Sequence, residues 1–501
     1  MKKNIKKLLV LPALFLLGSC AGNDTFSGGT GSRSDYYGYS CLDENYYYSG
    51  DYYYGDTNEY TEIRDNRFIN TAAQKSSYFS MCSSTAAYTN IKNMVMNEHI
   101  RPDEDAVMIE QMLNYFKYDY SLEEGESLKI FNEIADCPWN ESHKLASIAV
   151  KAKEVEERDR KSMNVVFLID VSGSMSNSLE LVKEAFVTLV DNLSANDRIS
   201  IVTYANKVKT VLNGGSLANK EQIISAINDL KASGGTNGSG GIEKAYSVAE
   251  DNFIEGGNNR VILASDGDFN VGISNGGILK DFIKEKREQS HVYLSVFGFG
   301  LGNYRNDFAE TLAKNGDGNM FYIDSLEEIQ RIFSSDLSAT FEVVARDVKA
   351  SVTFDTRYVH AYRLIGYENS KLTSSEYYDT RTDAGEILAG DVTVVLYEIV
   401  PEKNVPSDAQ YFKSEVRYKD PDSLAARVIS NQDSACSLIQ SLNFTFQAMV
   451  AEYGLLLRNS VYKGKANYQN ILDLYDENSE AFDADADRVE FRALVAATQL
   501  D

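Results

Sequence analysis

The middle of the chain alternates between short apolar runs and longer amphipathic segments. The run over residues 164–170 is almost continuously apolar, which predicts a buried strand, and residues 178–193 follow with the period of an amphipathic helix. The alternation continues with expected strands at 198–204, 260–264, 292–297 and 320–323 and expected helices at 220–231, 241–252, 278–288, 304–314 and 326–336. Strands that alternate with helices pair in parallel and carry helices on both faces. The pattern therefore predicts an α/β fold with a doubly wound, mostly parallel sheet over residues 161–340.

Two further modules are expected on either side of this domain. Residues 61–160 predict an N-terminal α/β module, whose boundary is the run of charged residues at 153–161. Residues 341–501 begin with period-2 alternation, which predicts antiparallel strands, and end with helical patterns. We therefore expect a C-terminal module that is β-rich and closed by helices. The flanking elements expected are helices at 89–97, 103–116, 438–458 and 489–500, strands at 348–354 and 392–399, and a turn at 137–140.

The first nineteen residues have the pattern of an export signal. Lysines precede an apolar run, Leu8–Leu17, which is too short to anchor the chain across a bilayer. Leu17-Gly18-Ser19-Cys20 resembles the bacterial lipobox, which implies cleavage before Cys20 and lipidation of its thiol with diacylglycerol and palmitate. A plain secretory signal with a chance cysteine is the alternative. Because Ala21 follows rather than aspartate, analogy favours the outer membrane, with the membrane face left open.

Residues 20–60 are rich in Tyr, Gly and Ser and show no helical or strand period. Ten tyrosines fall between residues 36 and 60. Such a composition favours a flexible tether between the lipid and the folded part of the chain. The alternative is a sticky aromatic segment that contacts glycan or neighbouring proteins.

Charge and cysteine spacing exclude several classes of function. With 49 Lys and Arg against 74 Asp and Glu, the formal net charge is −25, so the chain would be repelled by a nucleic acid backbone. Beyond Cys20 there are four cysteines, and none forms a C-x-x-C pair, which argues against a zinc ribbon or a thioredoxin-like site. Their disulfide pairing is open: Cys41, Cys82, Cys137 and Cys436.

Polar side chains with oxygen donors follow the expected strands. Asp170-Val171-Ser172-Gly173-Ser174 lies where the first strand ends, and Asp266 ends the strand at 260–264. Thr236 lies between them in a glycine-rich loop that can bring its hydroxyl to the same sheet edge. Oxygen donors alone suit a hard cation, Mg²⁺ first, with Mn²⁺ or Ca²⁺ as substitutes. Taken singly, these residues are also ordinary helix caps and turn residues.

The order Asp170-x-Ser172-x-Ser174, Thr236 and Asp266 resembles the metal-ion-dependent adhesion site of von Willebrand factor A domains. The resemblance implies a metal bound by these five residues and a protein partner that completes the shell with an Asp or Glu carboxylate. Residues 105–120, 137–140, 257–272 and 361–369 resemble a subfamily of bacterial envelope proteins in which this domain has flanking modules on both sides. Where such relatives often carry an Asp-x-Asp pair, this chain has Cys82 and Ser84.

The function expected from these features is a lipid-anchored envelope protein for adhesion or scaffolding, without catalysis. A Mg²⁺-dependent hydrolase that uses Asp170 or Asp266 is one alternative, although no G-x-S-x-G or Walker loop accompanies them. A chaperone-like role in envelope assembly is another, and the sequence does not separate it from adhesion.

Overall fold

The computed structural model describes residues 60–235, 238–266, 276–299, 306–333, 337–421, 423–432, 434–437 and 439–500. The predicted signal, Cys20 and the tether up to residue 59 lie outside the described residues, and so does Thr236.

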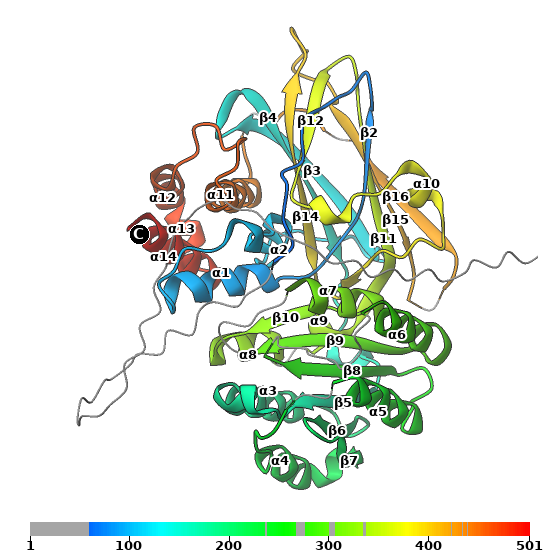
Figure 1. The fold of residues 1–501 in the computed structure, drawn as a ribbon. Helices are drawn as coiled ribbons and strands as arrows, with labels where there is room; N and C mark the ends of the chain where they lie inside the picture. The colour runs from blue at the N-terminus through cyan, green and yellow to red at the C-terminus, as the bar shows by residue number, and fades with distance from the viewer. Residues whose placement is uncertain are drawn as a thin grey trace, which may run out of the picture. The chain divides into compact units, whose positions relative to one another are not determined.

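The central α/β domain has a six-stranded sheet in the order β10-β9-β8-β5-β6-β7 (Figure 1). All neighbouring strands pair in parallel except β7, an edge strand that runs antiparallel to β6. The predicted doubly wound, mostly parallel sheet is confirmed. The strands are β5 (Met163–Asp170), β6 (Arg198–Tyr204), β7 (Lys209–Ser216), β8 (Asn258–Ser265), β9 (Val292–Phe299) and β10 (Met320–Ile323).

Helices cover both faces of this sheet. Alternate residues of β5 face opposite sides, so Phe167 packs with the core residues of α3, α4 and α8, and Leu168 with those of α5, α6 and α7. Every residue of β5 is buried, which explains its continuous apolar run. The helices are α3 (Leu179–Asp191), α4 (Lys220–Asn228), α5 (Gly238–Asp251), α6 (Gly276–Ser290), α7 (Asn306–Asn315), α8 (Leu326–Phe333) and α9 (Ser338–Phe341).

The segments before and after the α/β domain share their β-sheets. One sheet has the order β1-β12-β14-β4-β3, and the other has the order β13-β11-β15-β16, with β2 also paired to β11. The strands from the N-terminal side are β1 (Ile69–Asn70), β2 (Ser76–Ser80), β3 (Leu128–Cys137) and β4 (Asn140–Ala152). Those from the C-terminal side are β11 (Val343–Phe354), β12 (Val359–Ile365), β13 (Gly385–Leu388), β14 (Val392–Pro401), β15 (Phe412–Lys419) and β16 (Ala426–Asn431). The two expected flanking modules therefore form one body, called here the flanking body.

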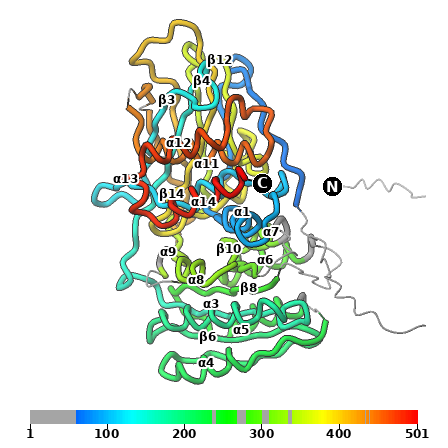
Figure 2. Tube along the Cα trace, turned by 90° about the vertical axis from the view of Figure 1, so that its left-hand side faces the viewer, coloured from blue at the N-terminus to red at the C-terminus, as the bar shows by residue number. Residues whose placement is uncertain are grey.

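The first sheet of the flanking body lies between two hydrophobic cores. Leu145 and Ala149 of β4 pack with helical residues on one side, while Ile148 and Val150 pack against the second sheet on the other. Figure 2 shows the C-terminal helices gathered beside this sheet. The helices of the flanking body are α1 (Ala86–Met96), α2 (Ile109–Asn114), α10 (Ser374–Tyr378), α11 (Leu442–Leu457), α12 (Tyr468–Glu477), α13 (Ser479–Phe482) and α14 (Ala486–Leu500).

One helix expected in the N-terminal segment needs correction, and one hairpin there was missed. The helix expected at 103–116 is divided into a short 3₁₀ turn, Glu104–Ala106, and α2, because Val107 and Met108 adopt extended backbone between them. The turn expected at 137–140 is confirmed as the tip of a long hairpin, in which β3 and β4 pair in antiparallel register from Leu128 opposite Ala152 to Cys137 opposite Asn140. Neither strand of this hairpin was expected from the sequence.

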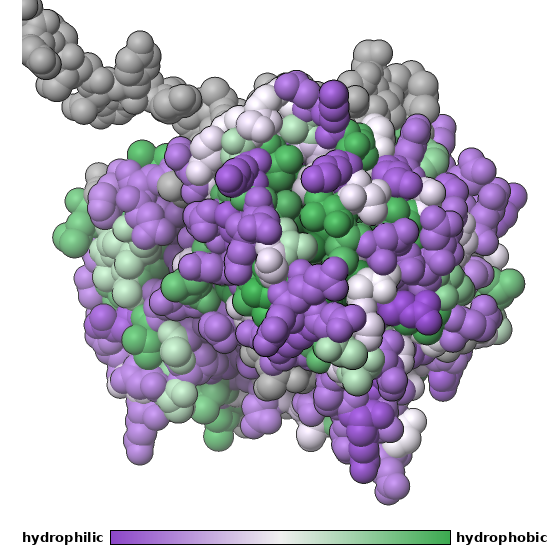
Figure 3. Space-filling view, turned by 90° about the horizontal axis from the view of Figure 1, so that it is seen from below, coloured by the Kyte–Doolittle hydropathy of each residue, from purple (hydrophilic) through white to green (hydrophobic). Residues whose placement is uncertain are grey.

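Hydrophilic side chains predominate on the face of the molecule seen from below (Figure 3). On the face drawn in Figure 3, hydrophobic residues form limited groups between hydrophilic ones. Within the ranges given above, no helix combines the length and the apolar character needed to cross a membrane. Among the exposed large apolar side chains are Ile100, Leu326, Leu424, Ile439, Val461 and Leu500.

Candidate metal centre

The two predicted aspartates lie at the point where the strand order of the α/β sheet reverses. β5 and β8 are adjacent parallel strands, with Ile169 opposite Ala264. Asp170 is the last residue of β5, and Asp266 directly follows β8. From this pair of strands the chain builds outward to β6 and β7 on one side and to β9 and β10 on the other. Such a switch point at the carboxyl ends of parallel strands is where open α/β sheets bind ligands.

Asp170 is fully buried and is held by its own loop. Its Oδ1 accepts a hydrogen bond from the backbone N–H of Ser172 at 2.7 Å. Its Oδ2 is also buried and has no hydrogen bond of normal geometry from any residue that the structure describes. Burial raises the pKa of Asp170 to about 6, against the lowering effect of Ser172, and the charge of Asp266 adds to the increase. Tyr204 also acts on this carboxyl group through its side chain and lowers the same pKa. A buried carboxylate oxygen is suited to a cation.

Two hydroxyl groups lie next to this carboxylate. Ser172 is buried and Ser174 is exposed, and their Oγ atoms are 2.9 Å apart. Both follow Asp170 within four residues, at the start of the 3₁₀ turn Gly173–Asn177 that leads into α3. The structure therefore brings Asp170, Ser172 and Ser174 together as predicted from the D-x-S-x-S spacing.

The glycine-rich loop before α5 is fastened to the same strand end. Gly173 donates its N–H to the carbonyl oxygen of Gly234 at 2.9 Å, and Ser233 donates to that of Val171 at 2.8 Å. Gly235 donates to Oδ1 of Asn206, which follows β6, at 2.9 Å. These hydrogen bonds hold the backbone of residues 233–235, which directly precede Thr236, beside the loop that carries Ser172. The placement of the Thr236 hydroxyl itself lies outside the described residues.

These donors fit a divalent cation of the Mg²⁺ class. Mg²⁺ binds oxygen ligands and retains several waters, so hydroxyls and one or two carboxylates suffice to hold it. In the described part of the chain, no group of three or more His, Cys, Asp and Glu side chains is arranged to bind a metal. A transition-metal site of that type is therefore not seen there. Asp170, Ser172, Ser174 and Asp266 are the described residues that would hold the ion.

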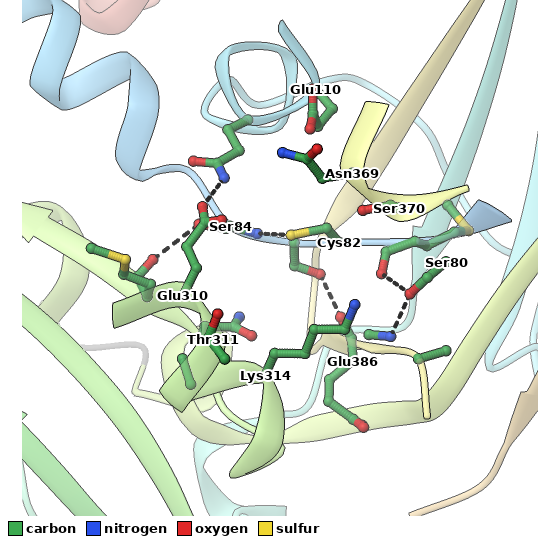
Figure 4. A pocket seen from close by; sticks show the side chains of 18 of the residues that line it. Ser80, Cys82, Ser84, Glu110, Glu310, Thr311, Lys314, Asn369, Ser370 and Glu386 are labelled. Carbon is green, nitrogen blue, oxygen red and sulfur yellow. Dashed lines mark hydrogen bonds between the residues drawn. The ribbon is translucent and has the colours of Figure 1, made fainter. Parts of the chain in front are cut away.

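A second site, a cavity of about 310 Å³, was not expected from the sequence. It lies where α2 and the segment before α1 meet α7 and β13, and Figure 4 shows side chains from all of them around it. Cys82 and Ser84, the pair that replaces Asp-x-Asp, line it. Burial raises the pKa of the Cys82 thiol to about 12, so this cysteine is not an activated nucleophile. Ser84 donates its hydroxyl to the carbonyl oxygen of Met320 in the α/β domain.

The cysteines within the described residues are free thiols. Cys137 is buried, while Cys82 and Cys436 are half-buried, and none of the three forms a disulfide with another described residue. Cys41 lies outside the described residues.

Three family models match the chain. The model "von Willebrand factor type A domain" matches residues 164–335 and "von Willebrand factor" matches residues 54–147. The model "Uncharacterized protein YfbK, C-terminal" matches residues 339–500. The predicted von Willebrand factor A domain with flanking modules is thus confirmed at the level of the family.

Similar proteins cover most of the chain. YfbK of Escherichia coli is 33% identical over 466 residues, which cover 88% of this chain and 80% of YfbK. The protein sll0103 of Synechocystis is 25% identical over 319 residues, covering 61% of this chain and 73% of that protein. Among solved structures, the von Willebrand factor type A protein from Catenulispora acidiphila matches with a TM-score of 0.40 at 15% identity, over 72% of this chain and 89% of that one.

Proposed function

This chain belongs to the family of YfbK and carries a von Willebrand factor type A domain, and we propose that it is a cell-envelope lipoprotein that binds a protein partner through a Mg²⁺-dependent adhesion site. The domain type indicates a function in protein interaction. Membership of the family does not establish the bound metal, the lipid anchor or the chemistry of the partner, and these are what we propose.

One observation carries the metal part of the proposal. The buried Asp170 carboxylate has an oxygen without a hydrogen bond of normal geometry within the described chain, beside the adjacent hydroxyls of Ser172 and Ser174. An uncharged hydroxyl pair neutralises little of a cation's charge. When bound, Mg²⁺ would supply an electrophilic centre with a coordination position open to an outside oxygen. The chain's own residues bind and orient that centre at the rim of the sheet.

The direction from which a partner can reach the metal follows from which residues of the site are exposed. Asp170 and Asp266 are the carboxylates at the described site, and both are buried, with Asp266 only 8% exposed. Ser174 is the exposed member of the set. A partner would approach from the side of Ser174 and present an Asp or Glu carboxylate. We expect no catalysis, because ligation by a partner's carboxylate requires no bond to be broken.

The membrane part of the proposal rests on the sequence at the N-terminus. Cleavage before Cys20 and lipidation of its thiol would anchor the chain to the envelope, with the outer membrane favoured by Ala21. The segment 20–60 would then act as a tether between the lipid and the first described residues.

Calorimetric titration with Mg²⁺ tests the metal. We expect saturable binding to the wild-type protein, a rise in the melting temperature, and loss of both in Asp170→Asn. The Asn variant keeps the oxygen that accepts the Ser172 N–H, so its melting temperature in EDTA should stay within a few degrees of the wild type. No heat and no stabilisation of the wild type would disprove the metal site.

Two further experiments test the partner and the anchor. An affinity pulldown from envelope extracts, run with Mg²⁺ and with EDTA, should recover a partner only with Mg²⁺ and only with an intact Asp170. Labelled palmitate should enter the wild type but not Cys20→Ala. Recovery that is equal with EDTA contradicts the adhesion mechanism, and equal labelling contradicts the anchor.

A further inference from the structure

A second cavity lies at the other end of the α/β strands from the metal centre, where β8 and β9 begin. Its volume is about 460 Å³, within the range of small-ligand sites. It is bounded by the segment that enters the α/β domain, through Lys161, and by the segment that leaves it, through Glu342 and Arg346. Asp266 follows the other end of β8, so this cavity is separate from the metal centre.

Arg260, on β8, is the feature of this cavity that requires explanation. The side chain is 1% exposed, and its guanidinium donates to Oγ of Ser295 at 2.6 Å and, at 3.4 Å, to Oδ1 of Asn258. Nη2 is buried and donates to no described residue, and Arg260 forms no ion pair with a described carboxylate. Burial lowers the pKa of Arg260, yet an arginine keeps its proton at neutral pH. Glu342, Glu386 and Asp317 act on Arg260 through their charges and raise its pKa, but no described carboxylate pairs with it directly, and a buried charge without a direct partner is costly.

Aromatic rings account for part of the environment of Arg260. Its guanidinium carbon lies 5.5 Å from the ring centre of Tyr293 and 5.8 Å from that of Phe341. Cation–π contacts of this kind attract the faces of the guanidinium. They do not satisfy its N–H groups, which lie in the plane of the group and require an acceptor.

A second arginine in the same cavity also has an N–H group without an acceptor among the described residues. Arg346, on β11, is half-buried, and its Nε is buried without a hydrogen bond to the described residues. Lys161 adds a third positive charge to the lining, against the carboxylates of Glu255 and Glu342. A net positive lining is unusual in a chain whose formal charge is −25. It points to an anionic ligand, because like-charged surroundings would be unfavourable for any cation.

We propose that this cavity binds the phosphate or carboxylate group of a small molecule through Arg260 and Arg346. Guanidinium groups bind both oxyanions through paired N–H donors. The cavity of Figure 4 gives no comparable argument. There the buried acid Glu110 can take up a proton instead of a ligand, because burial raises its pKa to about 7.

The test is thermal unfolding in EDTA with inorganic phosphate or succinate, at an ionic strength matched with sodium chloride. We expect the melting temperature of the wild type to rise with the logarithm of the concentration of at least one anion. Phosphate also stabilises proteins non-specifically. The specific part of the rise in melting temperature is therefore the difference between the wild type and a variant that lacks Arg346. Arg346→Gln should lose the excess rise, and Arg357→Gln should keep it, since Arg357 is an exposed residue paired with Asp355 outside the cavity.

A measurement on the wild type covers the case in which Arg346→Gln fails to fold. Phenylglyoxal modification of Arg346, followed by peptide mass spectrometry, should be slowed about tenfold when the anion is present at ten times its dissociation constant. A rise for phosphate alone assigns a phosphate ligand, and a rise for succinate alone assigns a carboxylate. Equal rises in wild type and Arg346→Gln, or no protection of Arg346 by either anion, would overturn the proposal.

Discussion

Gly173 and Gly234 join the two loops of the proposed metal centre, because the N–H of Gly173 donates to the carbonyl oxygen of Gly234 at 2.9 Å. Gly234 has a φ of +86°, and a Cβ added there would come within 2.5 Å of the Asn206 side chain. Asn206 in turn holds Gly235 through its Oδ1. The position of the loop before Thr236 therefore depends on the absence of a side chain at residue 234.

The first prediction concerns Gly234→Ala. We expect unfolding to become easier by about 1 kcal/mol from the positive φ alone, and the Mg²⁺ affinity to fall by about tenfold, or about 1.4 kcal/mol, as Asn206 and the loop move. Gly125→Ala is the matched control, because Gly125 has a φ of +88° and no atom near the added Cβ. Calorimetry with Mg²⁺ should separate them, and equal affinities in the two variants would contradict the role of this loop.

The second prediction concerns the buried ion pair of the flanking body. Arg363 donates to Glu398 at 2.7 Å, both side chains are at most 2% exposed, and His143 contacts the same carboxylate. Glu398→Gln leaves Arg363 buried without its counterion and should cost about 3–5 kcal/mol of unfolding free energy. Mg²⁺ binding by the folded variant should be unchanged.

An arginine–carboxylate pair on the surface supplies the control for this prediction. Arg427 and Asp420 are 3.0 Å apart, but their side chains are 54% and 39% exposed. Asp420→Asn should therefore cost less than about 1 kcal/mol. Urea unfolding of both variants measures the difference, and similar costs for the two would show that burial does not decide the strength of the pair.

The third prediction is a pH dependence that arises from Glu452 on α11. Burial raises the pKa of Glu452 from its ordinary value of 4.5 to about 7, and its carboxylate accepts the N–H of Asn467. Between these two pH values the folded chain holds a proton that the unfolded chain releases, so stability falls as the pH rises. The cost reaches about 3 kcal/mol above pH 7.

Glu452→Gln should remove this loss while keeping the oxygen that accepts the Asn467 N–H. We expect the variant to match the wild type at pH 4 and to be more stable at pH 8, by up to about 3 kcal/mol. Glu477→Gln, an exposed residue on α12, should leave the difference between pH 4 and pH 8 unchanged. The prediction is contradicted if the unfolding free energies of Glu452→Gln and the wild type fall by the same amount between pH 4 and pH 8.

The α/β domain was predictable because its strands are buried on both faces. The apolar run that ends at Asp170 indicates a central parallel strand, because such a strand is buried on both faces. Asp170 and Asp266 each lie at the carboxyl end of a predicted strand, so parallel pairing of the two strands brings them to the same end of the sheet. β7 was missed because an antiparallel edge strand with Asn213, Gly214 and Gly215 in its second half lacks both the apolar run and the alternation.

The flanking body was less predictable because its burial comes from tertiary packing. β4 is buried along Leu145–Ala152, yet its sequence contains small and polar residues that do not indicate a strand. Ser147 is accommodated there because it donates its hydroxyl to Gln447 of α11, 300 residues away in sequence. The pairing of β4 with β14 joins residues that are 241 to 255 positions apart, from Lys151 with Val392 to Lys144 with Ile399, and no local sequence pattern indicates such a partner.

The shared sheets determine the order in which the chain can fold during synthesis. β3 and β4 leave the ribosome long before β14, whereas all strands of the α/β domain lie between residues 163 and 323. The inserted α/β domain can therefore complete its own sheet first. During this time the β3–β4 hairpin, which is synthesised earlier, has no partner along the edge of β4 that later pairs with β14. Until β14 emerges, the unpaired backbone groups along that edge of β4 are open to pairing with other strands.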